Sequence, residues 1–453
     1  MTDAAAHDAF PDMTLADLES GLMRDPLNVA LHRAMFTKRQ EQGDELAALA
    51  HVIAATAIEN RASDPHTAGQ LYMVATGYFM KGDYAIAERW YQLVLMLNPD
   101  IAAVYQNMVV IHGHFGRHAE AEICRARAYQ IQRVFIDPIS NPLRRLLILC
   151  VGRTQGNIPY EVLLSAETSH RIKYIIDYAQ REEDRQLPPY DLVFNAIGEP
   201  DVAAPLTARL EQFLLHCACP VLNHPQAVAK TQRHKLPELL AGLDHVRIAA
   251  CCRIDAVSVD PRALSQLLSQ QNIRYPVLVR PTETHGGLGL KYCTNPTAIL
   301  GQLRATQSAH YLCSFIDFKS ADEYYRKYRI IFVDGKPYPY HLAISTHWMV
   351  HYYKADMLDN PWKIAEEQAF LHDAGAVLGA HAMSAIREIG VRLGLDYAGI
   401  DFTILPDGRL FVFEANATML VHRVSNDGAL AHKNANIQRI SDAFEQMQKD
   451  RLG

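Results

Sequence analysis

The chain has 453 residues and a formal net charge of −6, with 49% hydrophobic and 21% charged residues. This composition is typical of a globular protein of about two to four domains, and the mild acidity argues against a nucleic-acid-binding protein. No apolar run reaches the roughly 18 residues that a membrane span needs. The start, MTDAAAHDAFPDM, lacks a basic region followed by an apolar one. We therefore expect no secretory signal peptide, and a cytoplasmic protein whose eight cysteines are reduced thiols.

Residues 1–136 contain a spaced pattern of glycine and alanine that predicts helix pairs. Gly82 and Gly116 lie 34 positions apart, and so do Ala87 and Ala121. Gly43 begins an earlier unit, and the larger gap of 39 positions before Gly82 places a short insertion, RASDP, between the first two units. A 34-residue period with glycine at the turn between two helices predicts a stack of three such pairs, whereas an unrelated helical bundle is the alternative.

This pattern resembles the tetratricopeptide repeat, although Leu71 and Tyr105 stand where that family has tryptophan. Stacks of such repeats present a concave surface and carry no chemistry of their own. The resemblance therefore implies an all-α solenoid that binds a protein or peptide partner. The sequence leaves open whether the protein forms a homodimer.

Residues 137–225 predict a small α/β domain. The proline-containing segment FIDPISNPLRR (135–145) is expected to be a linker, and the apolar run LRRLLILCV a strand. A second strand in YDLVFNAIGEPD follows a helical stretch, and strands that alternate with helices favour an open α/β sheet. Asn195, Gly198 and Glu199 come at the end of that strand, where such sheets bind ligands, or else they form a structural turn.

Residues 226–453 predict an α+β domain with two hairpins and a glycine-rich turn. In YPVLVRPTETHGGLGLKYC, Gly286, Gly287 and Gly289 separate two strands and form a loop whose backbone amides can cover phosphate groups. The segment YRKYRIIFVDGKPYPYHLAIS predicts a hairpin with a basic first strand. The segment HWMVHYYKADM after it is a buried connection or else supplies substrate-pocket candidates, which are His347, His351, Tyr352 and Lys354.

The segment YAGIDFTILPDGRLFVFEAN predicts the second hairpin, which turns at Asp407 and Gly408 with positive φ at both residues. Such a two-residue loop gives the facing pairs Leu405–Leu410, Thr403–Val412 and Asp401–Glu414. Asn416 shares the face of Glu414 because side chains alternate along a strand. Two opposed carboxylates are destabilising unless a cation neutralises them, and Mg²⁺ prefers carboxylate and amide oxygens. The register therefore predicts a magnesium site, whereas a solvated polar face is the alternative.

The order of these motifs over residues 143–445 resembles the ATP-grasp carboxylate–amine ligases, in the branch near glutathione synthetase and the ribosomal-protein glutamate ligases. That resemblance implies bound ATP and Mg²⁺. The expected metal ligands are Asp401, Glu414 and Asn416, and the expected nucleotide contacts are Lys235, Arg280, Gly286, Gly287, Gly289 and the hinge residues Ser314, Phe315 and Ile316. Arg280 stands where most of the family has lysine, which keeps the positive charge. Arg329 is expected to steady an acyl phosphate.

The resemblance also implies the chemistry. A carboxylate attacks the γ-phosphate of ATP to give an acyl phosphate and ADP, and an amine then displaces phosphate. The glycine-rich loop closes as a lid in this scheme. Three functions compete: a ligase for a peptide or protein that the repeats recruit, a ligase for a small metabolite, and a non-catalytic ATP-binding scaffold. We expect the first, in a fold made of a repeat solenoid (1–136), a pre-ATP-grasp α/β domain (137–225) and an ATP-grasp α+β domain (226–453).

Overall fold

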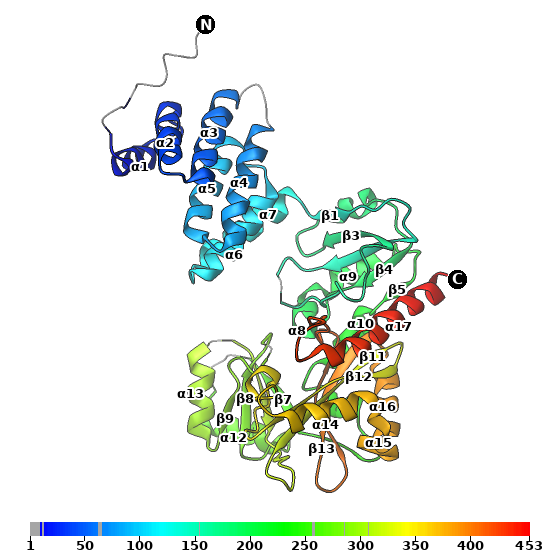
Figure 1. Ribbon diagram of the computed structural model, residues 1–453. Coiled ribbons are helices and arrows are strands. Elements are labelled where there is room, and N and C mark those ends of the chain that lie inside the picture. The colour runs from blue at the N-terminus through cyan, green and yellow to red at the C-terminus, as the bar shows by residue number, and fades with distance from the viewer. Residues whose placement is uncertain are drawn as a thin grey trace. The chain divides into compact units, whose positions relative to one another are not determined.

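The computed structural model describes residues 10, 13–61, 66–153, 155–255, 259–284, 286–306 and 308–453. The chain forms two compact units, Met1–Arg133 and Val134–Gly453 (Figure 1). The first unit ends just before the predicted limit at residue 136, because the next residues form a strand of the second unit. Within the described residues, no helix is both long and apolar enough to cross a membrane.

The first unit is built of helices. They are α1 (Leu15–Arg24), α2 (Val29–Glu41), α3 (Glu45–Asn60), α4 (Thr67–Lys81), α5 (Tyr84–Leu97), α6 (Ala102–His114) and α7 (His118–Ile131). Consecutive helices pack in pairs, α2 with α3, α4 with α5 and α6 with α7. Gly43, Gly82 and Gly116 lie at the turn inside each pair with φ of 74°, 83° and 71°, a conformation that suits glycine. The expected glycine turns are thus present.

Small residues let the helices of this unit approach one another closely. Ala54, Ala75 and Ala87 are fully buried in one apolar core that also contains Trp90 and Tyr91. Membership of the tetratricopeptide family stays a prediction, because helix pairs and glycine turns also occur outside it. Most of the expected insertion RASDP, residues 62–65, lies outside the described residues.

The second unit begins with a sheet of strand order β1-β3-β2-β4-β5. These strands are β1 (Val134–Asp137), β2 (Arg144–Cys150), β3 (Ser169–Ile175), β4 (Leu192–Asn195) and β5 (Val221–Leu222). β2 to β5 run parallel, as expected of an α/β domain, and β1 is an antiparallel edge strand. The prediction of a linker over 135–145 is therefore wrong in its first part, because backbone pairing with β3 orders residues that precede the prolines. The short helices here are α8 (Pro200–Ala203), α9 (Thr207–Leu214), α10 (Pro225–Val228) and α11 (Leu236–Leu239).

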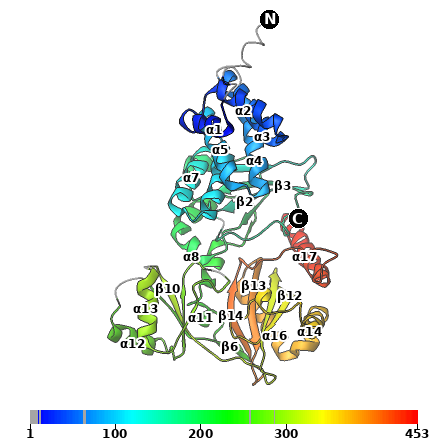
Figure 2. The same cartoon turned by 60° about the vertical axis from the view of Figure 1, so that its left-hand side comes forward.

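Two further sheets lie side by side in the rest of this unit (Figures 1 and 2). The order β7-β10-β8-β9 is formed by β7 (Cys251–Ile254), β8 (Val277–Pro281), β9 (Lys291–Cys293) and β10 (His310–Ser314). The order β12-β11-β13-β14-β6 is formed by β6 (Val246–Ile248), β11 (Tyr325–Val333), β12 (Lys336–Ser345), β13 (Tyr397–Ile404) and β14 (Leu410–Asn416).

Helices cover one face of each of these sheets. α12 (Pro261–Gln270) and α13 (Pro296–Thr306) share a core with the first of them through Leu264, Ile299 and Val277. α14 (Pro361–His372), α15 (Ala374–Leu378), α16 (Ala380–Leu393) and α17 (Asn434–Leu452) complete the chain. Of these, α14, α16 and α17 contact β12 of the second sheet. The opposite faces of these two sheets are available to form a binding site.

The final hairpin differs from its predicted loop but keeps its predicted carboxylate pair. Gly408 has a φ of 82°, whereas Asp407 does not have positive φ, and the Gly408 amide donates to the Leu405 carbonyl. The turn therefore starts one residue earlier, and the pairs near it are Ile404–Leu410, Thr403–Phe411 and Phe402–Val412. A bulge at Phe413 then shifts the register by one residue, so that Asp401 again faces Glu414.

The expectation of eight reduced cysteines is wrong at one pair. Cys251 and Cys313 lie directly opposite each other on β7 and β10 and form a disulfide. They are 62 residues apart in the sequence, so their proximity depends on strand pairing that the cysteine spacing does not reveal. The other six cysteines are free thiols.

Candidate functional site

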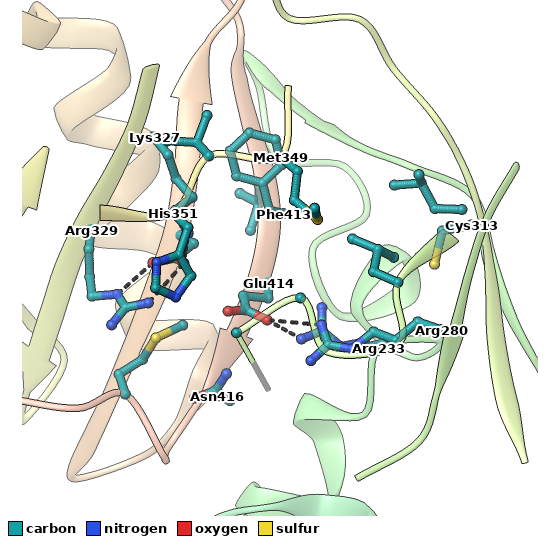
Figure 3. Close-up of a pocket in the computed structure, with 18 of the residues that line it drawn as sticks. Arg233, Arg280, Cys313, Lys327, Arg329, Met349, His351, Phe413, Glu414 and Asn416 are labelled. Carbon is teal, nitrogen blue, oxygen red and sulfur yellow. Dashed lines mark hydrogen bonds and ion pairs between the residues drawn. The ribbon is translucent and has the colours of Figure 1, made fainter. Parts of the chain in front are cut away.

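The second unit holds a cavity of about 550 Å³ lined by residues from both of its neighbouring sheets (Figure 3). The charged side chains among the described lining residues are Arg233, Arg280, Lys327, Arg329, Lys433, Asp401 and Glu414. The cations outnumber the carboxylates, so the cavity favours an anionic ligand.

A row of polar side chains crosses the sheet beneath this cavity. His341 on β12 is the Cα partner of Arg329 on β11, Arg329 is the partner of Asp401 on β13, and Asp401 is the partner of Glu414 on β14. Direct partners on neighbouring strands place their side chains on the same face. Four residues far apart in the sequence therefore line one wall of the cavity.

Asp401 is 2% exposed and is neutralised by two cations. Arg329 donates to its carboxylate through Nε at 2.6 Å and Nη2 at 2.9 Å, and the Lys327 Nζ lies 3.2 Å from Oδ2. Burial alone would raise the pKa of Asp401, but Arg329 and Lys327 outweigh it and hold the pKa well below its ordinary value. Asp401 is therefore ionised at neutral pH.

Glu414 is held from the opposite side of the cavity. Arg233 donates to its Oε2, and the Arg280 Nη1 lies 3.9 Å from the same oxygen. Figure 3 shows Arg329 on one side of Glu414 and the two other arginines on the other side. Burial raises the pKa of Glu414, but the charge of Arg233 outweighs it, and the pKa falls to about 2.

Arg280, on β8, is a largely buried cation whose side chain is 11% exposed. Its Nε donates to the Thr284 hydroxyl at 3.2 Å, and its Nη2 donates to the Thr284 carbonyl. Burial and the neighbouring Arg233 guanidinium lower the pKa of Arg280 to about 10, so it stays charged at neutral pH. Arg233 and Arg280 both pair with Glu414, and the cavity lining holds more cations than carboxylates, which leaves positive charge to be matched by a ligand.

The three predicted metal ligands all line the cavity. Asp401 and Glu414 supply carboxylate oxygens, and Asn416 supplies an amide oxygen that now accepts from the Thr418 hydroxyl at 3.1 Å. This set of hard oxygen donors fits Mg²⁺. The described residues contain no cluster of three or more His, Cys, Asp or Glu that could hold a metal ion, so Asn416 and ligand oxygens would have to complete the coordination.

Lys235 does not join the predicted nucleotide residues. It is exposed at the start of α11, and its Nζ donates to the Ala229 carbonyl at 3.4 Å. Arg233, two residues earlier, occupies the cavity instead. The segment KTQRHK contains several cations, and the sequence pattern did not indicate which of them turns inward.

The predicted hinge and glycine-rich loop lie at the cavity, with one exception. Ser314, Phe315 and Ile316 line it, as do Gly286 and Gly287. The Phe315 amide already donates to the Pro276 carbonyl at 2.8 Å. Gly289 is not a lining residue: its φ is 71°, and an added Cβ would lie 3.0 Å from Pro281, so the turn itself requires glycine there.

The substrate-pocket candidates divide into two groups. His351 and Tyr352 line the cavity, whereas His347 and Lys354 do not. Sequence reasoning did not single out four further lining residues, which are Tyr340, His341, His422 and Lys433. They come from β12, from the chain after β14 and from the turn before α17, and no local motif marks them.

The polar end of β4 has a structural role. Asn195 is fully buried and donates to the Asn223 carbonyl at 2.9 Å. A Cβ on Gly198 would lie 2.6 Å from Ile158, so only glycine fits. Glu199 caps α8, and burial raises its pKa to about 7. These contacts favour the alternative of a structural turn over a ligand site.

Comparison with solved structures gives distant similarities to ligases. A D-alanine–D-alanine ligase from Bacillus anthracis complexed with ATP is 11% identical, with 68% of this chain and 99% of that chain covered at a TM-score of 0.40. A RimK domain ATP-grasp protein from Sphaerobacter thermophilus is 14% identical, with 66% and 98% covered at a TM-score of 0.39. The ATP-grasp ligase PsnB, complexed with Mg, ADP and a variant of its minimal precursor, is 13% identical, with 68% and 100% covered at a TM-score of 0.39.

No family model and no curated protein matches the chain. Identities and TM-scores at the level of the solved structures do not establish a family or an activity for it.

Proposed function

We propose that residues 134–453 bind ATP with Mg²⁺ and join a carboxylate to an amine, with release of ADP. The observation that carries this proposal is the facing pair of Asp401 and Glu414, each held by guanidinium groups in one cavity. Opposed carboxylates surrounded by excess cations suit a ligand that combines polyphosphate with a divalent metal ion. The motif order of the sequence supports the same chemistry.

We assign Arg233 and Arg280 to the phosphate groups of ATP. A guanidinium presents paired donors that match phosphate oxygens, and both groups are desolvated, which strengthens each contact. When phosphate oxygens take these donors, Glu414 becomes available to a metal ion. Mg²⁺ held by Asp401, Glu414 and Asn416 would offset the charge that develops on the phosphates.

We assign Arg329 and Lys327 to the reacting carboxylate. One carboxylate oxygen attacks the γ-phosphorus, and the bond to the ADP oxygen breaks. The amine nitrogen then attacks the acyl carbon, phosphate leaves with the electron pair of the carbon–oxygen bond, and the proton lost by the nitrogen passes to the departing phosphate. Cationic side chains next to the acyl phosphate stabilise the charge in both steps, so positioning and neutralisation suffice and no covalent enzyme intermediate is needed.

The glycine-rich loop is suited to cover the phosphates. Gly286 and Gly287 have φ of 61° and 79°, and a Cβ on Gly287 would lie 3.3 Å from the Met349 sulfur. A backbone without side chains can approach a phosphate closely and close the cavity against water.

A binding titration followed by a turnover screen tests the proposed function. An ATP analogue should bind the purified protein with Mg²⁺ and more weakly with EDTA. Candidate carboxylates, amines and peptides are then screened for ADP release. Failure to bind the analogue contradicts the proposal, and binding without turnover across the panel favours the scaffold alternative.

Arg280→Lys should retain ATP binding within about tenfold of the unchanged protein, because the charge remains while the two bonds to Thr284 are lost. Arg280→Met should weaken binding by about 100-fold or more, since a buried charge–phosphate contact is lost. Fluorescence titration with an ATP analogue measures both. Equal affinities for the two variants would remove Arg280 from the phosphate site.

The first unit supports the finer proposal that the substrate is a recruited peptide or protein. It holds its own cavity of about 550 Å³, lined by His32, His51, Trp90 and further apolar side chains, together with charged residues of both signs. The charged lining residues are Glu19, Arg39, Asp44, Lys81, Asp83 and Arg89. The Nδ1 atoms of the two histidines lie 3.0 Å apart, and burial lowers the pKa of His51 to about 3, so the pair is uncharged at neutral pH. A pocket that combines apolar side chains with charges of both signs suits a peptide segment with an apolar side chain next to polar or charged groups.

A chain shortened to Val134–Gly453 should bind ATP and Mg²⁺ normally, because every proposed ligand lies within it. Its kcat/KM on an identified peptide substrate should fall by about tenfold or more, mostly through KM, since docking is lost and the chemistry is not. Steady-state kinetics of the full and shortened chains measure this. Equal kcat/KM values would favour a small-metabolite ligase, and a circular dichroism spectrum checks that the shortened chain is folded.

A further inference from the structure

A second polar group lines the cavity next to Arg329, on the side away from Glu414. His341 stands beside Arg329 on the outer strand β12, at the end of the row of side chains opposite to Glu414. Lys433 reaches the same cavity from the turn Ala431–Lys433 before α17. The proposed phosphate and metal contacts use neither residue.

His341 has a ring nitrogen without a hydrogen-bond partner. Its side chain is 8% exposed, and its Nε2 is buried and unpaired. Burial and the positive charge of Arg329 keep the pKa of His341 well below its ordinary value, so the ring is neutral. A buried polar atom without a partner is destabilising, and a neutral imidazole can donate to or accept from a ligand.

Lys433 is a buried cation next to a carboxylate that has several other partners. It is 4% exposed, and its Nζ lies 4.1 Å from the centre of the Tyr352 ring and 5.1 Å from that of Tyr340. Among the described residues, the carboxylate next to it is Glu367, at 3.7 Å. An ammonium carries three donors, so Lys433 has capacity for a further acceptor.

Glu367 has three hydrogen-bond donors besides Lys433. It is fully buried and accepts from the Tyr352 hydroxyl at 2.8 Å, from the His432 Nε2 at 3.0 Å and from the Leu342 amide at 3.2 Å. The buried ammonium of Lys433 is destabilising unless its remaining donors also find an acceptor. Lys433 pairs with Glu367 and also lines the cavity, so the ammonium donors that Glu367 does not take are available to a ligand.

We propose that Lys433 and His341 bind a second, non-reacting carboxylate of the substrate. This inference rests on the proposed function, since it concerns the substrate of the same cavity. A compact ammonium with one neutral imidazole, walled by two tyrosine rings, suits the small and singly charged carboxylate, whereas the arginines beside Glu414 offer the paired donors that suit phosphate. The substrate is therefore a diacid, either a small molecule or an acidic peptide.

Calorimetric titration of the full chain with matched ligands tests this subsite. Glutarate and its monoamide differ only in the second carboxylate, and the peptide Ala-Ala-Glu with its amidated form makes the same comparison for a peptide source. Each is titrated with and without a saturating non-hydrolysable ATP analogue and Mg²⁺. We expect at least one diacid to bind tenfold or more tightly than its monoamide.

Lys433→Met should abolish that preference, and Lys433→Arg should retain part of it. The methionine keeps the apolar contacts with the tyrosine rings, but Glu367 loses an ammonium partner, so the Tm should fall. A circular dichroism spectrum checks that each variant is folded before it is titrated. Lys449→Met, on the exposed side of α17, removes the same charge and should leave the preference unchanged. His341→Phe should weaken diacid binding without changing the affinity for the ATP analogue.

The results separate the subsite from the ATP site. If no diacid is preferred over its amide, or if Lys433→Met retains the preference, the subsite is wrong. If the ATP analogue fails to bind while the diacid preference exists and depends on Lys433, the subsite stands and the ATP-dependent function fails. A preference confined to glutarate or to the peptide identifies the source of the carboxylate.

Discussion

Glu414→Gln should weaken the Mg²⁺-dependent binding of an ATP analogue by about 100-fold, which corresponds to about 2.7 kcal/mol. Glutamine keeps the length of the side chain and can still accept a hydrogen bond from Arg233, but it cannot offer a negative charge to a metal ion. Titration with a fluorescent ATP analogue at fixed Mg²⁺, repeated with EDTA, measures the loss. The affinity with EDTA should change much less, because only the metal-dependent part involves the carboxylate.

Asp407→Asn provides the matched control. It removes a carboxylate from the turn of the same hairpin, where Asp407 is exposed and pairs with Arg409 at 2.6 Å. Its affinity should stay within about twofold of that of the unchanged chain, because long-range effects of exposed charges are screened. Unchanged binding by Glu414→Gln, or an equal loss in both variants, would show that Glu414 is not a metal ligand.

The stability of Glu414→Gln relative to the unchanged chain should depend on pH. The pKa of Glu414 falls to about 2, below the ordinary value of 4.5, so its ionised form stabilises the fold above pH 4.5 and this contribution is lost as the pH falls towards 2. Glu414→Gln should therefore melt at a lower temperature than the unchanged chain at pH 7. The difference in Tm should shrink in acid, and thermal melts between pH 3 and about 7 measure it.

The sequence allowed the carboxylate pair to be predicted because two local errors cancel. The turn at Leu405 starts one residue earlier than Asp407-Gly408 suggested, and the bulge at Phe413 restores the offset. The predicted pairing of Asp401 with Glu414 is therefore correct, although the predicted pairs between it and the turn are wrong by one residue. Hydrophobic alternation constrains which face a strand buries, but it does not locate a bulge.

Residues brought in from distant segments could not be predicted in the same way. His341 and Lys433 are 92 positions apart, and each lies in a segment without a recognisable motif. Their common position follows from the packing of α17 and α14 against β12. The disulfide between Cys251 and Cys313 likewise follows from the pairing of β7 with β10, and it contradicts a prediction based on composition alone. Helix and strand patterns indicated the elements, and tertiary packing decided which side chains meet.

Arg233→Met and Lys235→Met should differ strongly, although both remove one positive charge within the same turn of chain. Arg233 lines the cavity and binds Glu414, whereas the Lys235 side chain is exposed and donates to the Ala229 carbonyl. We expect Arg233→Met to weaken binding of the Mg²⁺–ATP analogue by about 100-fold and Lys235→Met by less than about threefold. Titrations of both variants under one buffer condition measure the contrast.

The effect of Arg233→Met on stability reports the contact of Arg233 with Glu414 separately from its contact with ATP. Without nucleotide, the variant leaves Glu414 with Arg280 at 3.9 Å as its remaining guanidinium partner, so the pKa of Glu414 should rise and the Tm should fall. Arg233→Lys restores a charge but not the paired donors, so it should recover more Tm than ATP affinity. A loss of affinity in Lys235→Met as large as that in Arg233→Met would contradict the assignment. It would mean that the lysine turns onto the phosphates when nucleotide binds, as the family resemblance implied, and that Arg233 serves mainly to hold Glu414 until the metal ion arrives.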